Sequence, residues 1–160
     1  MEKLLVFDMD GTIADFYGVE GWLDDLMAEN PRPYIEAQPL YNMNKLRGLL
    51  ELMRLDGWKI GIVSWLSKES PSSEFKKEIR RAKQYWLEEY DFPCDEVHII
   101  KYGTNKKHIC RGIYTVKVLV DDEKLNRIRW GNDETNFSLE PNEDLLINLA
   151  ELYEKFYEGI

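Results

Sequence analysis

The sequence predicts one α/β domain built around an open, mainly parallel sheet. Four short apolar runs lack the polar alternation of a half-exposed strand, which favours strands covered on both faces. Segments with helical spacing of apolar residues lie between these runs, and this alternation is typical of sheets joined by right-handed crossovers. A length of 160 residues, of which 44% are hydrophobic, fits a single domain with a substantial core.

Each element is expected from its own local pattern. The strands are predicted at Leu4–Phe7, Lys59–Val63, Val97–Ile100 and Val116–Val120. Apolar residues three or four positions apart predict helices over 22–27, 43–53 and 75–86. The first should stop at Asn30-Pro31 and the second at Asp56-Gly57, whereas Ser72 or Ser73 begins the third. A last helix, over 145–156, is expected either to dock on the sheet or to meet a partner.

The charge of the chain is acidic overall but unevenly distributed. A net charge of −9 argues against indiscriminate binding to DNA or to an anionic membrane. Residues 101–130 carry eight basic and three acidic residues, whereas residues 131–160 carry one and eight. This pattern predicts either two differently charged solvated faces or a local field that attracts anions.

Composition also indicates the cellular compartment in which the protein is expected. The longest apolar runs are far shorter than a bilayer span, and the apolar stretch near Met1 is too brief for a signal peptide. The two cysteines, Cys94 and Cys110, form no CxxC pair, which excludes a disulfide framework and a cysteine-rich zinc site. We therefore expect a cytoplasmic protein without a membrane partner.

Acidic residues follow the first and fourth predicted strands. Asp8-Met9-Asp10-Gly11-Thr12 places two carboxylates in one tight turn, where they repel each other unless a cation offsets the charge. Mg²⁺ prefers such oxygen ligands and is held by one or two carboxylates. Asp121 and Asp122 directly follow the fourth strand and supply a second pair of carboxylates for the cation.

The second and third strands contribute a hydroxyl and a lysine. Ser64 ends the second strand and can donate to a phosphate oxygen, and Lys106 or Lys107 follows the third strand and can neutralise a phosphate. Ligands bind at the carboxyl ends of strands in open α/β sheets. If the strands are neighbours, the four motifs form one site for Mg²⁺ and a phosphoryl group.

In these four motifs the chain resembles the haloacid dehalogenase-like (HAD) superfamily of phosphotransferases, from about residue 4 to about residue 130. The resemblance implies a Rossmann-like three-layer sandwich, a single domain over residues 1–160, and a minimal helical cap inserted at about 15–40. The stretch Val6–Phe16 is similar to the opening of the 5′(3′)-deoxyribonucleotidases. The stretches Tyr102–Lys106 and Asp121–Trp130 resemble small phage and bacterial HAD-like proteins.

The resemblance implies a mechanism for these residues. Asp8 is the expected nucleophile, giving an aspartyl-phosphate, and Asp10 the general acid and then base. Ser64 and Lys106 are expected to hold the phosphoryl oxygens, helped by amides after Asp8, and the spacing favours Lys106 over Lys107. Mg²⁺ is expected to take Asp8, the carbonyl of Asp10 and an acid of the fourth motif. Asp122 is preferred over Asp121, which would hold water or Lys106, although the two roles can be exchanged.

The substrate is expected to be a small phosphoester, specifically a nucleoside monophosphate, hydrolysed with Mg²⁺. Aromatic residues near the predicted mouth can stack on a base or fill the junction with the cap: Phe16, Tyr17, Trp65 and Tyr102. The cap is smaller than that of the known deoxyribonucleotidases. Two alternatives therefore stay open, namely a polynucleotide end phosphatase and a HAD-fold binding or regulatory protein without turnover. The oligomeric state is not predicted.

Overall fold

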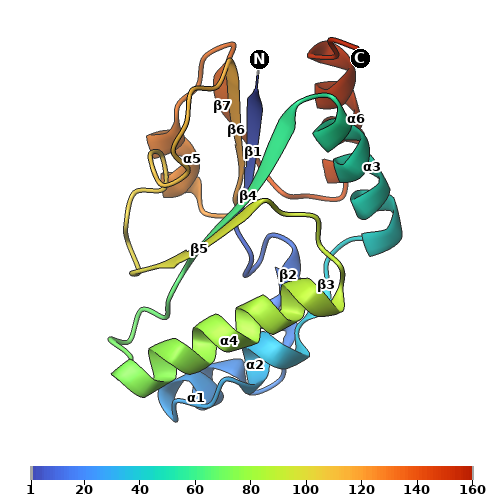
Figure 1. Ribbon diagram of the computed structural model, residues 1–160. Coiled ribbons are helices and arrows are strands. Elements are labelled where there is room, and N and C mark those ends of the chain that lie inside the picture. Colours follow the sequence, from blue (N-terminus) through green and yellow to red (C-terminus); the bar gives the residue numbers. More distant parts are fainter. Residues whose placement is uncertain (1, 160) are drawn as a thin grey trace.

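The computed structural model describes residues 2–159 and contains one central parallel sheet (Figure 1). Five strands lie in the order β5-β4-β1-β6-β7, and every neighbouring pair is parallel. Their bounds are β1 (Lys3–Phe7), β4 (Trp58–Trp65), β5 (Glu96–Ile100), β6 (Val116–Val120) and β7 (Asn136–Leu139). The predicted α/β class is therefore confirmed, with all four predicted strands in place.

Helices cover both faces of the sheet, as the continuous apolar strands require. On one face, alternate residues of β1 such as Leu5 and Phe7 pack under α3 (Met43–Leu55) and α6 (Leu145–Lys155). On the other face, Leu4 and Val6 pack with Trp130 of α5 (Lys124–Trp130). Figure 1 shows these three layers edge-on, with α5 on one side and the α3–α6 pair on the other.

A long helix and an insertion lie beyond the carboxyl end of the sheet. Ser72 is the N-cap of helix α4 (Ser73–Glu89), and its hydroxyl accepts a hydrogen bond from Phe75 N. The insertion is closed at its base by the antiparallel pair β2 (Ala14–Asp15) and β3 (Gln38–Pro39). Between them lie the 3₁₀ turn Phe16–Gly18, α1 (Trp22–Met27) and α2 (Arg32–Glu36), and α2 packs against α4 (Figure 1).

Several elements differ from the sequence-based expectation. The sequence predicts no helix directly after the stop at Asn30-Pro31, but this segment forms α2, because proline is tolerated in the first turn of a helix. Helix α5 and strand β7 were not predicted. Strand β7 is an edge strand of only four half-buried residues, so it shows no continuous apolar run.

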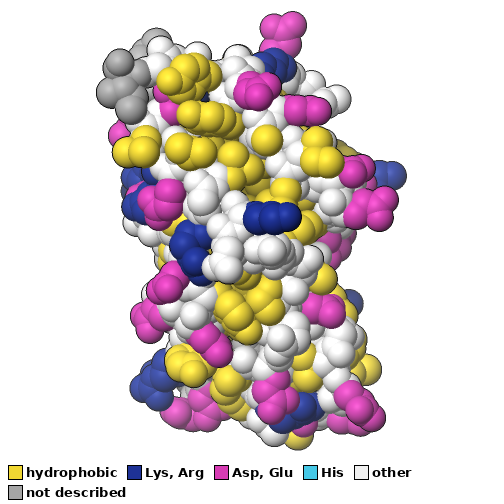
Figure 2. Space-filling view, turned by 90° about the vertical axis from the view of Figure 1, so that its right-hand side faces the viewer, with side chains coloured by type: hydrophobic (Ala, Val, Ile, Leu, Met, Phe, Trp, Pro, Cys, Tyr) yellow, Lys and Arg dark blue, Asp and Glu magenta, His cyan; other side chains and the backbone are white. Residues whose placement is uncertain are grey.

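The C-terminal helix docks on the sheet, which decides between the two expectations stated for it. Leu145, Leu149 and Leu152 of α6 belong to the main core. The opposite sides of α3 and α6 still expose apolar side chains such as Leu55 and Ile147, and Figure 2 shows apolar groups on this side of the molecule. Among residues 2–159, no helix has the length and apolarity needed to span a bilayer.

Candidate active site

Three carboxylates meet at the carboxyl edge of the sheet. Asp8 directly follows β1, and Asp121 and Asp122 directly follow β6. Because β1 and β6 are parallel neighbours with Phe7 opposite Val120, the two strand ends are level with each other. One oxygen from each of the three carboxylates lies within 4.8 Å of the other two.

Lys106 joins the carboxylates of two of these strand ends. Its Nζ donates to Asp8 Oδ1 at 3.0 Å and to Asp121 Oδ2 at 2.8 Å. The lysine is 3% exposed, and its ammonium also lies over the Trp65 ring. Lys106 therefore reaches the acidic site, as its spacing predicts. Lys107, the alternative lysine, does not line the cavity at this site.

The turn after Asp8 is organised around a glycine and a threonine. Gly11 has a φ of +77°, and a Cβ at this position would lie 2.5 Å from Asp122 Oδ2. The Thr12 hydroxyl accepts from Asp122 N and lies 3.2 Å from Asp8 Oδ2 and 3.1 Å from Asp122 Oδ1. The N–H groups of residues 11–14 all donate within the turn, so they are not the free amides expected after Asp8.

The two acids of the fourth motif have different surroundings. Asp121 is fully buried and accepts from Lys106, from Asn126 Nδ2 and from Glu123 N. Asp122 is exposed at the cavity and is bonded mainly to Thr12. Burial and the charge of Asp8 raise the pKa of Asp121 to about 6 and that of Asp122 to about 8. Crowded like charges thus make this site unfavourable without a compensating cation.

A second lysine, which the sequence analysis missed, lies on the other side of the acidic turn. Lys83 of α4 is 1% exposed, and its Nζ donates to Asp10 Oδ2 at 2.9 Å. The same ammonium donates to Ser64 Oγ at 2.6 Å and to the carbonyl of Trp65 at 2.8 Å. Because the Ser64 oxygen accepts from Lys83, its own hydrogen remains available for another acceptor.

The position of Lys83 within its helix could have revealed it. The apolar stripe of α4 contains Ile79, Ala82 and Trp86, and Lys83 lies four residues after the first and three before the last. A lysine on such a stripe must be buried, and a buried ammonium requires an acidic or carbonyl partner.

The two aspartates of the turn have pKa values shifted in opposite directions. Burial disfavours ionisation of Asp8, but the attraction and hydrogen bond of Lys106 outweigh it, so the pKa of Asp8 falls below its usual value. Burial dominates at Asp10, and the charge of Asp8 adds to it, so the pKa of Asp10 is raised despite Lys83. The two shifts therefore favour the anionic form of Asp8 and the protonated form of Asp10.

Asp8, Asp10, Lys106, Asp121 and Asp122 line a cavity of about 250 Å³, whereas the fully buried Ser64 and Lys83 do not line it. Its upper walls are aromatic, from the insertion on one side and from β4 and the loop after β5 on the other: Phe16, Tyr17, Trp22, Tyr34, Trp65 and Tyr102. Tyr17 is 54% exposed, whereas Phe16 is only 3% exposed and packs between Tyr17, Trp22 and Tyr34. Of the predicted base-stacking residues, Tyr17 therefore offers the most accessible ring.

The donor set fits a hard divalent cation. The cluster of Asp8, Asp121 and Asp122 offers only oxygen ligands, which Mg²⁺ prefers. Lys106 and Asn126 already occupy Asp121, whereas Asp8 Oδ2 and Asp122 make few contacts. Burial and the charge of Asp8 raise the pKa values of Asp121 and Asp122, and a bound cation would offset both effects.

Comparison with known proteins supports the fold. No protein-family model matches the chain, and no curated protein sequence matches it. Among solved structures, it is similar to D,D-heptose 1,7-bisphosphate phosphatase from B. bronchiseptica, determined with magnesium and phosphate. The TM-score is 0.56 and the identity 12%, over 96% of this chain and 99% of that one. At this identity the likeness concerns the architecture, and it confirms the predicted HAD-like α/β fold.

Proposed function

We propose that this protein is a metal-dependent phosphomonoester hydrolase that uses Asp8 as its nucleophile. The observation that carries the proposal is that Asp8, Asp10, Lys106 and Asp122 line one cavity at the carboxyl edge of the sheet, with Lys106 bonded to Asp8. A covalent mechanism needs one carboxylate as an anion and a second as a proton donor. The similar fold of a phosphatase determined with magnesium and phosphate supports the same conclusion.

The proposed reaction has two balanced steps. In the first, a carboxylate oxygen of Asp8 bonds to phosphorus while the ester P–O bond breaks, and Asp10 gives its proton to the leaving oxygen. In the second, Asp10 takes a proton from water as the water oxygen bonds to phosphorus. The bond between phosphorus and Asp8 then breaks, which releases inorganic phosphate and restores both side chains.

Lys106 is the side chain proposed to hold the transferred phosphoryl group. Ser64, which was expected to share this role, is fully buried, does not line the cavity and accepts from Lys83, so in this proposal it holds Lys83 beside Asp10. Lys106 uses two of its three ammonium donors on Asp8 and Asp121, which leaves one for the phosphoryl group. Asp8 and Asp122 would hold Mg²⁺, and the ion would supply positive charge that allows an anionic carboxylate to approach an anionic phosphate.

A nucleoside monophosphate is the substrate we propose within this class. The cavity, of about 250 Å³, is slightly smaller than the usual range for small-molecule sites, about 300–1,000 Å³, which favours a compact phosphoester over a long polymer. Tyr17 and Tyr102 present partly exposed rings at the cavity, and such rings stack on bases.

Phosphate release from a substrate panel tests the proposal. The panel contains mononucleotides, sugar phosphates and 3′-phosphorylated oligonucleotides, each with and without Mg²⁺. We expect Mg²⁺-dependent release from mononucleotides, and a phosphorylated protein detectable by intact mass after rapid acid quench. Asp8→Asn should abolish both signals. Turnover by the Asp8→Asn variant would contradict covalent catalysis, and release from oligonucleotides alone would replace the substrate class.

A further inference from the structure

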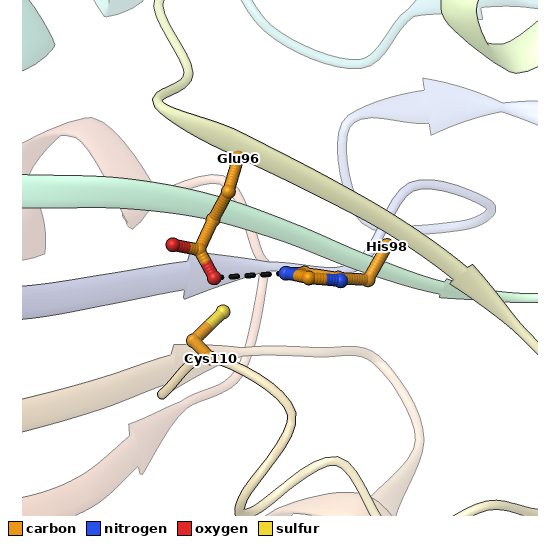
Figure 3. Close-up of side chains that lie close together, drawn as sticks. All are labelled: Glu96, His98 and Cys110. Carbon is orange, nitrogen blue, oxygen red and sulfur yellow. Dashed lines mark hydrogen bonds and ion pairs between the residues drawn. The ribbon is translucent and has the colours of Figure 1, made fainter. Parts of the chain in front are cut away.

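A second cluster of ligand-type side chains lies away from the cavity of the candidate active site. Glu96 and His98 extend from the edge strand β5, and Cys110 lies in the segment that leads into β6 (Figure 3). His98 Nε2 is 2.8 Å from Glu96 Oε1, and one ligand atom from each of the three residues lies within 4.8 Å of the others. None of the three lines the cavity that holds Asp8.

A glycine in the neighbouring strand leaves space for the sulfur atom of Cys110. Cys110 is 5% exposed and packs against Val6 and Val63 on the α5 side of the sheet. Gly61 of β4 lies beneath it, and a Cβ at position 61 would be only 2.9 Å from Cys110 Sγ. The absence of a side chain at this strand position is therefore what allows the thiol to sit beside Glu96.

The surroundings of Glu96 suit a monodentate ligand. Lys59 Nζ binds Glu96 Oε2 at 3.0 Å, whereas Oε1 faces His98. A hydrogen bond from a neighbour to the second carboxylate oxygen orients many metal-binding carboxylates. The side chain of His98 is 36% exposed, so solvent reaches the open side of the cluster.

We propose that Glu96, His98 and Cys110 form a binding site for one zinc-type divalent ion. Nitrogen, sulfur and a single carboxylate oxygen are the ligands that Zn²⁺ takes, with water completing a tetrahedral set. The two negative charges of a thiolate and a carboxylate balance the dication. In the metal-free protein, burial and Glu96 raise the pKa of the Cys110 thiol, so metal binding displaces its proton.

A bound ion would connect the loop that contains Lys106 to strand β5 of the sheet. Cys110 lies four residues after Lys106, and Ile109 N donates to the carbonyl of Lys106. Binding Cys110 to Glu96 and His98 would tie this loop to β5 at a point close in sequence to Lys106. The site is thus expected to stabilise the loop and not to take part in the chemistry.

Zinc and cobalt binding to the whole protein test this site. Protein stripped with a chelator is titrated with Zn²⁺ against a chromogenic competitor, and separately with Co²⁺. We expect one Zn²⁺ per chain beyond any ion at the acidic site, a thiolate-to-cobalt charge-transfer band, and a melting temperature raised by roughly 5–10 °C at saturating Zn²⁺. Cys110→Ser should remove the band, and His98→Ala should weaken Zn²⁺ binding by more than about tenfold.

Two matched variants make the result specific. Cys94→Ser removes the other cysteine, and this variant should still show the charge-transfer band. Asp122→Asn should impair the acidic site, and this variant should show the band as well. The proposal would be overturned if the wild-type protein gave no charge-transfer band. It would also be overturned if Cys94→Ser removed the band and Cys110→Ser did not. Because the band reports a thiolate ligand, this outcome is independent of whether the phosphatase proposal holds.

Discussion

Replacing Lys83 by methionine should move the pH dependence of catalysis to higher pH. Lys83 is the only cation that donates directly to Asp10 among residues 2–159, at 2.9 Å. An opposite charge at such a distance lowers a carboxyl pKa by about 1–3 units, so its removal should raise the pKa of Asp10 by a similar amount. Because a general acid must be protonated, the descending limb of kcat/KM against pH should shift upward by roughly 1–3 units.

The same change should destabilise the protein. The Lys83 side chain is 1% exposed and that of Asp10 is 20% exposed, so methionine leaves a buried carboxyl group without its cation. Removing one partner of a buried ion pair typically costs about 3–5 kcal/mol. Lys3→Met is the matched control, because Lys3 is equally buried and pairs with Asp56 at 2.9 Å on the opposite side of the fold.

The assay compares both variants with the wild type over a range of pH, by phosphate release from one substrate at saturating Mg²⁺. Urea unfolding measures the stability loss of each. We expect a stability loss in both variants but a displaced pH limb only in Lys83→Met. If a folded Lys83→Met protein kept the wild-type limb, or moved it to lower pH, Lys83 would not act through Asp10.

Three further predictions concern the turn, the acidic cluster and the aromatic wall. Gly11→Ala should weaken Mg²⁺ binding and activity at least tenfold, since the new Cβ would lie 2.5 Å from Asp122 Oδ2, and titration with Mg²⁺ checks this. The raised pKa values of Asp121, about 6, and Asp122, about 8, mean that the metal-free protein should lose stability as pH rises from 5 to 8. The gain in melting temperature from Mg²⁺ over EDTA should therefore grow across that range, and a gain that is constant with pH would refute it. Tyr17→Ala should weaken the binding of a mononucleotide by about 1–3 kcal/mol but leave the binding of methyl phosphate unchanged. Tyr85→Ala, at an equally exposed tyrosine, should change neither affinity.

The central sheet could be predicted because its strands carry their own signal. Leu4–Phe7 is apolar on both faces, and Val116–Val120 is interrupted only by Lys117. Each run is followed by acidic residues, which the parallel pairing of the two strands brings to the same edge of the sheet. Strand β7 and helix α5 lack such runs. They are held by the fold around them, for example by Asn136, whose side chain donates to the carbonyl of Trp130.

The acidic side of the candidate site could be predicted for the same reason, but its second lysine could not be assigned. Asp8, Asp121 and Lys106 each follow a strand, so one rule of topology brings them together. Lys83 lies in the middle of a helix, and its contact with Asp10 depends on how α4 crosses the end of the sheet. Local sequence shows that Lys83 must find a partner, but only the packing of the helix shows which one.

The two buried lysines explain how one short turn can hold carboxyl groups in opposite states. Asp8 and Asp10 are two residues apart, and the charge of each opposes ionisation of the other. At Asp8, Lys106 together with the charge of Lys83 outweighs burial, whereas at Asp10 the charge and hydrogen bond of Lys83 do not outweigh burial and the charge of Asp8. The positions of the two lysines, and not the Asp-x-Asp spacing alone, therefore shift the two pKa values in the opposite directions that the proposed roles of Asp8 and Asp10 require.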